Sequence, residues 1–340
     1  MKIAIDAMGG DDAPKEIVLG AIEATEQFDC ELVLVGDKEK INKVLATKPN
    51  WNRNKISIYH ADEVIEMGEH PGAAVRRKKN SSIVVATRLV KTGECDAVLS
   101  AGSTGAAVAA ALLGLGRISG IDRPTIATPL PNSEGITLLL DSGANVDSKP
   151  NQLKQSAIMG AIYAKYVFGI HNPKVGLLNI GEEPTKGNEQ ALSTYPLLQS
   201  LKTINFIGNV EGRDIPKGTV DVVVCDGFVG NIVLKFAEGL AKTMIDLLKD
   251  AIKNSNIFSK LAALVLKSSL KKLSKRVDYA EYGGAPLLGV DGCFIICHGS
   301  SKAKAIRSAV GITCNYIKND VVQHIKENVI KEADVENVKE

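Results

Sequence analysis

Aromatic residues are scarce in this chain, at only 4% of 340 residues. Proteins that hold single-stranded nucleic acid stack its bases on aromatic side chains, so this composition disfavours that class. An excess of charge of one sign is also lacking, because 41 Lys and Arg against 39 Asp and Glu give a formal net charge of +2. A protein that neutralises many phosphates is more basic than this, and we therefore expect no nucleic-acid partner.

Long apolar runs and a dense cysteine pattern are lacking as well. No run approaches the ~18 apolar residues that a membrane-spanning helix requires. The first ten residues, MKIAIDAMGG, read directly as a strand and have no apolar segment typical of a signal peptide. The 6 cysteines are scattered along a long chain, unlike the framework of a small secreted domain. We expect a cytoplasmic protein with reduced thiols.

What the sequence does have is 31 glycines and an alternation of short β-branched runs with longer helical patterns. This alternation is typical of βα units around a mostly parallel sheet. We expect one α/β domain over 1–340, with three layers (α/β/α) and a helical excursion at 253–280. Strands are predicted at 3–7, 32–35, 56–59, 97–100, 125–127, 137–140, 175–179, 204–207, 220–225 and 294–297, and helices at 14–27, 81–92, 104–115, 150–168, 188–201, 230–252 and 301–327.

Five predicted strands end at a polar residue that enters a glycine turn. The carboxyl ends of parallel strands share one edge of a sheet, where ligands bind. Glycine lets backbone N–H groups approach an anion, and a following helix adds its positive end. The turn at 100–105 is the best such cradle, although glycines also make tight turns without any ligand. The five turns cover 6–11, 100–105, 141–145, 179–183 and 226–231.

Several motifs that would name another chemistry are missing. There is no Walker A motif, and the glycines at 114–120 have the wrong spacing for a dinucleotide fingerprint. No G-x-S-x-G elbow appears, so a serine hydrolase is disfavoured. Cys293 and Cys297 alternate with Ile295 along a strand, and with His298 they lack the second cysteine pair of a zinc site. We therefore expect neither a cofactor nor a metal, and a site for phosphate or acyl phosphate.

Two polar residues in these turns are candidates for catalysis. Lys186 lies just before a predicted helix, where a cation opposes the helix dipole unless an anion offsets it. Its alternative is a solvated loop lysine. Asn231 lies where a strand turn becomes a helix, so it is either an N-cap or a hydrogen-bond donor to a developing oxyanion.

Two basic segments stand out in an otherwise balanced chain. Arg76, Arg77, Lys78 and Lys79 precede a helix and form either a solvated face or a docking site for an acidic partner. The segment 253–276 carries seven basic residues and no acid, with Lys253, Lys260 and Lys267 recurring every seven residues on one predicted face. Such a basic amphipathic helix binds a membrane surface, or else packs on the core or a second subunit. Its apolar face comprises Ile257, Phe258, Leu261, Leu264 and Val265.

Taken together, the motifs of this chain resemble those of the phosphate acyltransferases of bacterial phospholipid synthesis, the PlsX family. The likeness runs through nearly the whole chain in the same order. One departure is Ser103, which stands where the usual motif Ser-Ala-Gly-Asn-Thr-Gly has asparagine. The motifs are IDAMGGDDAP at 5–14, RRKKNSS at 76–82, SAGSTGA at 100–106, LLLDSGANVD at 138–147, GLLNIGEE at 176–183, GNVEGRDI at 208–215, DVVVCDGFVGN at 221–231, YGGAPLLG at 282–289 and HGSS at 298–301.

The resemblance implies conversion of an acyl-[acyl-carrier protein] and inorganic phosphate into acyl phosphate and free carrier protein. It implies a fold like that of phosphotransacetylases and isocitrate dehydrogenases, a homodimer, and peripheral association with an anionic membrane. The family's catalytic lysine and asparagine fall on Lys186 and Asn231. Phosphate or substrate is expected to contact Asp6, Gly9, Gly10, Ser100, Gly102, Ser103, Thr104, Gly105, Asn145 and His298.

Three other functions remain open at this point. One is a phosphate acetyl- or butyryltransferase that uses acyl-CoA in the same type of reaction. Another is a metal-dependent hydroxy-acid dehydrogenase on the same fold, which would need clustered aspartates and a nucleotide fingerprint. The third is a non-catalytic membrane scaffold that recruits a partner through 253–276.

Overall fold

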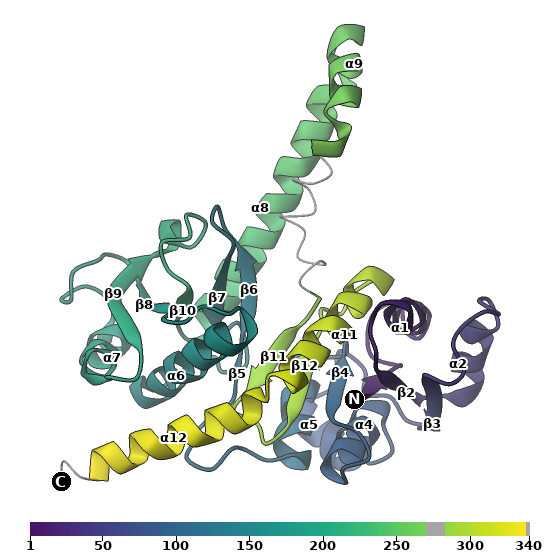
Figure 1. Ribbon diagram of the computed structural model, residues 1–340, viewed down its shortest axis with the longest axis horizontal. Helices are drawn as coiled ribbons and strands as arrows, with labels where there is room; N and C mark the ends of the chain where they lie inside the picture. The colour runs from purple at the N-terminus through teal and green to yellow at the C-terminus, as the bar shows by residue number, and fades with distance from the viewer. Residues whose placement is uncertain (270–282, 338–340) are drawn as a thin grey trace.

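The computed structural model describes residues 1–269 and 283–337. Its strands form two sheets, each mostly parallel and each flanked by helices (Figure 1). This is the expected α/β architecture. The division into two sheets is a feature that the sequence pattern alone did not reveal, and it creates an opening between the sheets.

The first sheet has seven strands in the order β3-β2-β1-β4-β12-β11-β5. The five strands from β3 to β12 are parallel, while β11 is antiparallel to both of its neighbours. The carboxyl ends of β1, β4 and β12 therefore lie at one edge. The bounds are β1 (Lys2–Asp6), β2 (Glu31–Gly36), β3 (Ile56–His60), β4 (Ala97–Ser100), β5 (Thr125–Ile126), β11 (Ala285–Leu288) and β12 (Cys293–Ile296).

The second sheet has five strands in the order β6-β7-β10-β8-β9. The four strands from β7 to β9 are parallel, and β6 is an antiparallel edge strand. The loops that follow β7, β10, β8 and β9 thus emerge side by side. The bounds are β6 (Thr128–Pro131), β7 (Ile136–Leu140), β8 (Lys174–Asn179), β9 (Asn205–Glu211) and β10 (Val222–Val224).

The helices cover both faces of the first sheet. Successive residues of a strand point to opposite faces, and here the residues on both faces are apolar and need cover. On β1, Ile3 and Ile5 belong to the cluster packed with α1 and α11, whereas Ala4 belongs to the cluster on the face of α4. This makes three layers. The helices are α1 (Lys15–Gln27), α2 (Lys38–Leu45), α3 (Pro71–Arg77), α4 (Ser82–Lys91), α5 (Thr104–Gly114), α6 (Pro150–Val167), α7 (Glu189–Ser200), α8 (Gly227–Lys253), α9 (Ile257–Val265), α11 (Ala303–Lys318) and α12 (Val321–Asn337).

Some elements differ from the prediction for identifiable reasons. Strand β6 contains Pro129 and Pro131, which disfavour a central strand but are tolerated at a sheet edge. The helix predicted at 301–327 is two helices, because Asp320 adopts a φ of 46° between α11 and α12. Strand β11 and helices α2 and α3 were not predicted from the sequence.

Helix α8 is 27 residues long and runs from the second sheet into a projection whose outer end also contains α9 (Figure 1). The projection begins before the expected position 253, and 270–282 lie outside the described residues. The helix is interrupted at 254–256. Asn256 caps α9 by accepting a 3.0 Å hydrogen bond from the N–H of Ser259. The predicted single face for Lys253, Lys260 and Lys267 is therefore wrong, since Lys253 ends α8 and Lys260 belongs to α9.

Candidate functional site

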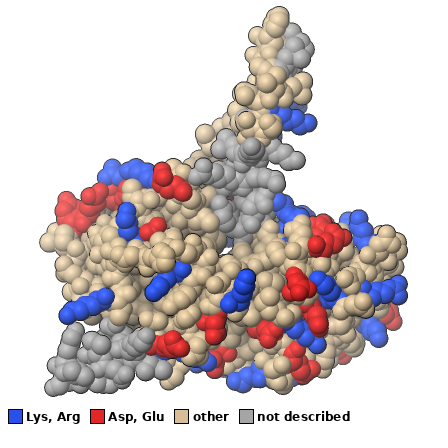
Figure 2. Space-filling model, in the orientation of Figure 1, with Lys and Arg blue, Asp and Glu red and all other residues tan. Residues whose placement is uncertain are grey.

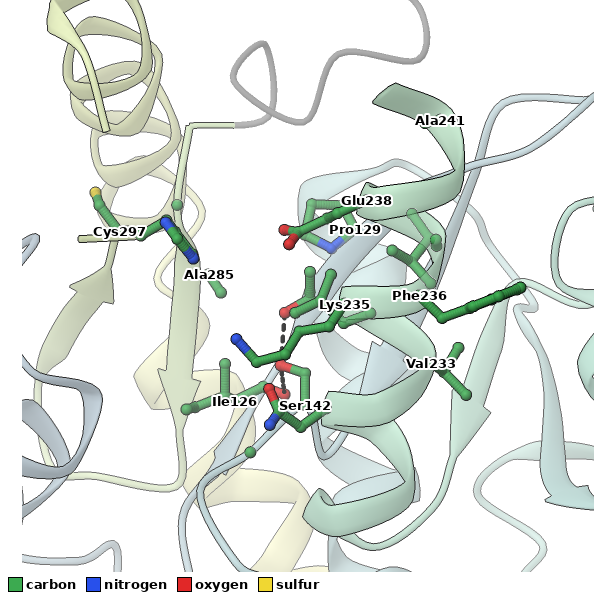
Figure 3. Close-up of a pocket in the computed structure, with 18 of the residues that line it drawn as sticks. Ile126, Pro129, Ser142, Val233, Lys235, Phe236, Glu238, Ala241, Ala285 and Cys297 are labelled. Carbon is green, nitrogen blue, oxygen red and sulfur yellow. Dashed lines mark hydrogen bonds between the residues drawn. The ribbon is translucent and has the colours of Figure 1, made fainter. Parts of the chain in front are cut away.

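A cavity of about 1090 Å³ opens between the two sheets and the adjoining face of α8 (Figure 3). Both sheets and α8 contribute to its lining. The loops after β1, β4 and β12 and the start of β11 come from the first sheet, and β6 and the loops after β7 and β9 come from the second. A long stretch of α8 provides most of the other lining residues. The cavity thus lies at the carboxyl edge that the strand-end turns predicted.

The loops of the first sheet touch one another through glycines. A Cβ at Gly9 would lie 2.5 Å from an Asp6 carboxylate oxygen and 2.7 Å from the backbone nitrogen of Gly102. Only glycine therefore allows the two turns to approach so closely. Backbone hydrogen bonds join the third loop, since the N–H of Cys297 donates to the carbonyl of Ser100 at 2.8 Å. Gly102 and Thr104 line the cavity from this cluster.

Asp6 is buried beneath these loops and is held by the neighbouring strand. The Ser100 hydroxyl donates a 2.7 Å hydrogen bond to the Asp6 carboxylate, and the N–H of Gly102 donates to the Ser100 oxygen at 3.1 Å. Burial raises the pKa of Asp6, although hydrogen bonds from Ser82 and Ser100 act in the opposite direction. Asp6 and Ser100 are therefore fixed behind the cavity and support the turn that faces it.

Asp141 organises the turn of the second sheet in the same way. Its carboxylate accepts hydrogen bonds from the N–H groups of Ile126 (3.0 Å), Ala144 (3.0 Å) and Asn145 (2.7 Å). The Asn145 side chain adds a 2.9 Å bond to the same carboxylate and a 2.7 Å bond to the carbonyl of Pro124. Burial raises the pKa of Asp141, although these hydrogen bonds act to lower it. In this structure Asn145 holds the turn together and is not among the residues lining the cavity.

The base of α8 is pressed against this turn. The N–H of Gly227 donates to the carbonyl of Asn145 at 2.7 Å, and a Cβ at Gly230 would lie 1.9 Å from the carbonyl oxygen of Asp141. Asp226 is the N-cap, because its carboxylate accepts a 2.8 Å hydrogen bond from the N–H of Val229. The N-cap alternative for Asn231 is therefore wrong. Asn231 lies inside α8 and lines the cavity.

Beyond Asn231, α8 provides an apolar wall. The lining residues recur at helical spacing toward the outer end of the helix, so the cavity has a polar end at the strand loops and an apolar extension. Val233 and Leu234 are partly buried against the apolar cluster of the second sheet, whereas Phe236 is 68% exposed and Met244 is 60% exposed. The apolar lining residues of α8 are Val233, Leu234, Phe236, Ala237, Leu240, Ala241, Met244, Ile245 and Leu248.

Lys186 lies on the loop that follows β8, at the carboxyl edge shared with β10. Its side chain is exposed, and it is not among the residues described as lining the cavity. The backbone of the loop is fixed, because the Asn179 side-chain amide donates a 3.0 Å hydrogen bond to the carbonyl of Lys186. The structure therefore brings Lys186 to the same sheet edge as Asn231, but Lys186 lies on a loop and Asn231 lies within α8.

The predicted binding residues divide into two groups. Gly102, Thr104 and His298 line the cavity, and a 2.7 Å hydrogen bond links the His298 Nδ1 to the Ser300 hydroxyl. The others are not among the described lining residues. These are Asp6, Gly9, Gly10, Ser100, Ser103, Gly105 and Asn145. Ser103 is the N-cap residue of α5 and makes no side-chain cap hydrogen bond, which leaves the first N–H groups of α5 without that partner.

The basic run at 76–79 forms the end of α3 and the residues after it. Glu69 forms ion pairs with Lys78 and, at 2.9 Å, with Arg77. The hydrogen bond from Lys78, followed by the one from the N–H of Glu66, lowers the pKa of Glu69. The start of α3 packs on α5, because a Cβ at Gly105 would lie 2.6 Å from the Pro71 ring. Arg76 and Lys79 are exposed and make no described ion pair. Within the run 76–79, Arg76 and Lys79 are therefore the two exposed cations without a described ion pair.

The residues predicted to meet a membrane lie on α9. Phe258 is 78% exposed and Val265 is 82% exposed, and Leu264 is exposed as well. The side chains of Ile257 and Leu261 lie outside the described residues. None of the described helices is long and apolar enough to cross a membrane. On the face in Figure 2, charges of both signs are scattered over the body, while most of the projecting helices is uncharged.

Cys293 and Cys297 are buried among apolar residues, as expected, and of the six cysteines only Cys314 is half-buried. Burial raises the pKa of Cys297 to about 12, so its thiol is protonated at neutral pH. A cluster of three acidic side chains was not predicted from the sequence. The carboxylate oxygens of Glu182, Glu211 and Asp214 lie within 4.8 Å of one another. Asp214 also forms a 3.2 Å ion pair with Lys217.

Other features of the cavity escaped sequence analysis. Ser142 and Gly143 belong to the recognised turn at 141–145 but were not expected to line the site. Lys235 lies four residues after Asn231, and this spacing places both on one face of a helix. The spacing was available in the sequence. The apolar wall could have been inferred from the periodicity of α8, whereas its exposure could not.

Comparison with known proteins agrees with this fold. The solved phosphotransacetylase from Streptococcus pyogenes is similar over 95% of this chain and 94% of its own, with a TM-score of 0.64 and 20% identity, a likeness that establishes the fold. The phosphate acyltransferase of Desulfitobacterium hafniense is 58% identical over 97% of this chain and 98% of that protein. That of Pelotomaculum thermopropionicum is 56% identical over 97% and 95%. The family model described as "Fatty acid synthesis protein" matches residues 1–324. The chain therefore belongs to the fatty acid synthesis protein family whose curated members are named phosphate acyltransferase.

Proposed function

We propose that this chain transfers an acyl group from the thioester of an acyl carrier protein to inorganic phosphate, for phospholipid synthesis. Membership of the family makes the chain an acyltransferase. The observation that carries the finer proposal is the form of the cavity, which joins a polar end at the strand loops to an apolar wall on α8. A phosphate and a long hydrocarbon chain fit these two ends.

The reaction requires few protein groups. A phosphate oxygen attacks the thioester carbonyl, forming a C–O bond and a tetrahedral oxyanion. The C–S bond then breaks, and the carrier thiolate leaves and takes up a proton. Asn231 donates from its carboxamide to the oxyanion, while Lys186 neutralises phosphate at the same sheet edge. The N–H groups at the start of α5 hold the phosphate beside Gly102 and Thr104.

The acyl donor is proposed to be a protein because of the charge near the cavity. Acyl carrier proteins present an acidic surface, and Arg76 and Lys79 offer unpaired charge at the end of α3. Helix α3 packs on α5, whose first turn reaches the cavity, so a partner held by α3 lies close to the polar end.

Membrane association and pairing of two copies complete the proposal. The exposed apolar side chains of α9 suit the interface of an anionic lipid surface. The exposed apolar side chains of α8 suit the matching helix of a second copy, because obligate homodimer interfaces are rich in apolar area. The exposed apolar residues of α8 are Phe228, Val229, Ile232, Phe236, Leu240, Met244, Leu247 and Leu248.

The test is formation of acyl phosphate from a long-chain carrier thioester, with and without orthophosphate. We expect product only when phosphate is present, and a rate far above that with acetyl-CoA. A higher rate with acetyl-CoA would assign the chain to the acyl-CoA class instead. Vesicle binding without any phosphate-dependent transfer would leave only the scaffold.

A further inference from the structure

The cavity contains one cation that no motif singled out. Lys235 is the only lysine or arginine among the described residues that line it. It extends from α8 into the cavity, whereas its neighbour Phe236 turns to the other side of the helix (Figure 3). Lys186, the lysine expected to neutralise phosphate, is exposed like Lys235, but it lies on a separate loop and is not among the described lining residues.

The Lys235 ammonium has no protein partner in the described part of the chain. Glu238, three residues further along α8, also faces the cavity, but no ion pair joins the two side chains. Asp11 is the other acid of the lining and likewise makes no described ion pair with Lys235. A cation left unpaired beside an apolar wall is available to an anion that enters the cavity.

The surroundings of Lys235 suit a phosphate. Asn231 lies one turn before it on the same face of α8, so the two side chains are neighbours about 5–6 Å apart at Cβ. Gly102 and Thr104 line the same cavity at the uncapped start of α5. The ammonium, the carboxamide and the N–H groups at that helix start therefore border one space.

We propose that Lys235 binds the phosphate substrate in this cavity, beside the carbonyl that Asn231 polarises. Its charge offsets the phosphate, which carries between one and two negative charges at neutral pH. The inference rests on the proposed function, because it assigns the phosphate of that reaction to a position on α8. It leaves Lys186 a role at the rim of the same edge.

Lys235→Met tests the proposal, because methionine keeps the length and helix preference of the side chain and removes its charge. We expect KM for phosphate to rise about tenfold or more, as for the loss of one charge-assisted hydrogen bond. KM for the acyl-carrier thioester stays within about twofold. Lys235→Arg retains the charge and recovers most of the phosphate affinity.

Lys242→Met is the matched control. Lys242 lies on α8 seven residues later, is exposed, and is not among the described lining residues. Its replacement is expected to leave KM for phosphate unchanged. An unchanged KM in Lys235→Met, or an equal rise in Lys242→Met, overturns the proposal.

Calorimetric titration with orthophosphate separates failure of this inference from failure of the function. Wild-type protein that binds phosphate but forms no acyl phosphate contradicts the proposed reaction. Loss of that binding in Lys235→Met then still supports the assignment of the cation. Wild-type turnover together with equal phosphate binding in both proteins refutes the assignment alone.

Discussion

Gly143 and Asn231 come from different elements and meet at the wall of the cavity. A Cβ at Gly143 would lie 3.7 Å from the Cβ, Cγ and Oδ1 atoms of Asn231. Gly143 has a φ of 138°, a conformation that side chains rarely adopt, so glycine is favoured at this turn. The absent Cβ leaves room beside the carboxamide, and both residues line the cavity.

Asn231→Ala is expected to lower kcat by about 100- to 1,000-fold, because it removes one donor to the oxyanion. KM for both substrates should change much less, since the hydrogen bond strengthens as the charge develops. Asn231→Asp keeps the size of the side chain but replaces the donor with an acceptor. A carboxylate variant as active as wild type would show that donation is not the role of this residue.

Lys186→Ala is expected to reduce turnover by at least about 100-fold while the protein stays folded. The side chain is exposed, and substitution of an exposed side chain changes folding free energy by about 0.5 kcal/mol or less. Release of carrier thiol in the presence of orthophosphate gives the rate, and thermal unfolding gives the control. Release at the wild-type rate would remove Lys186 from the mechanism.

Reversal of charge at Arg76→Glu with Lys79→Glu is expected to raise KM for the acyl-carrier protein about tenfold at low salt. The difference should shrink in ~0.5 M salt, because ions screen exposed charges. The matched control is Lys38→Glu with Lys43→Glu, two exposed lysines of α2. An equal effect in the control, or one independent of salt, contradicts docking at α3.

Phe258→Glu with Val265→Glu is expected to abolish flotation with anionic vesicles, because each buried apolar side chain contributes about 1.5–3 kcal/mol. Both side chains are exposed on α9. The control is Leu192→Glu with Ile207→Glu, two exposed apolar residues of α7 and β9. Turnover of a soluble thioester is measured alongside. Flotation that persists in the α9 variant would assign α9 to contacts between proteins.

Much of the fold was predictable because each βα unit carries its own local signals. A polar residue ends the strand, a glycine turn follows, and a helix begins, as at Ser100 before α5. Elements that depend on tertiary context were missed. Strand β6 exists because an antiparallel partner accepts Thr128–Pro131 at the sheet edge, which no local pattern reports.

The candidate site was predictable to the level of turns and not of individual lining residues. The turn at 141–145 was recognised, but its residues have different roles. Asn145 donates hydrogen bonds to Asp141 and Pro124, while Ser142 and Gly143 line the cavity. The start of α8 was predicted at 230, three residues after its observed start at Gly227, and Asn231 therefore resembled an N-cap. Lys235 gave no signal of its own because a single lysine on a helix is usually solvated.

The two glycines at the root of α8 have a mechanical consequence. A helix of this length spans roughly 40 Å at 1.5 Å per residue, and Gly227 and Gly230 seat its inner end directly on backbone atoms. Val233 and Leu234 pack on the second sheet just beyond this seat, so the inner turns of α8 are held on both sides of Asn231. A displacement of the exposed outer turns is therefore taken up beyond Leu234 and leaves the carboxamide in place.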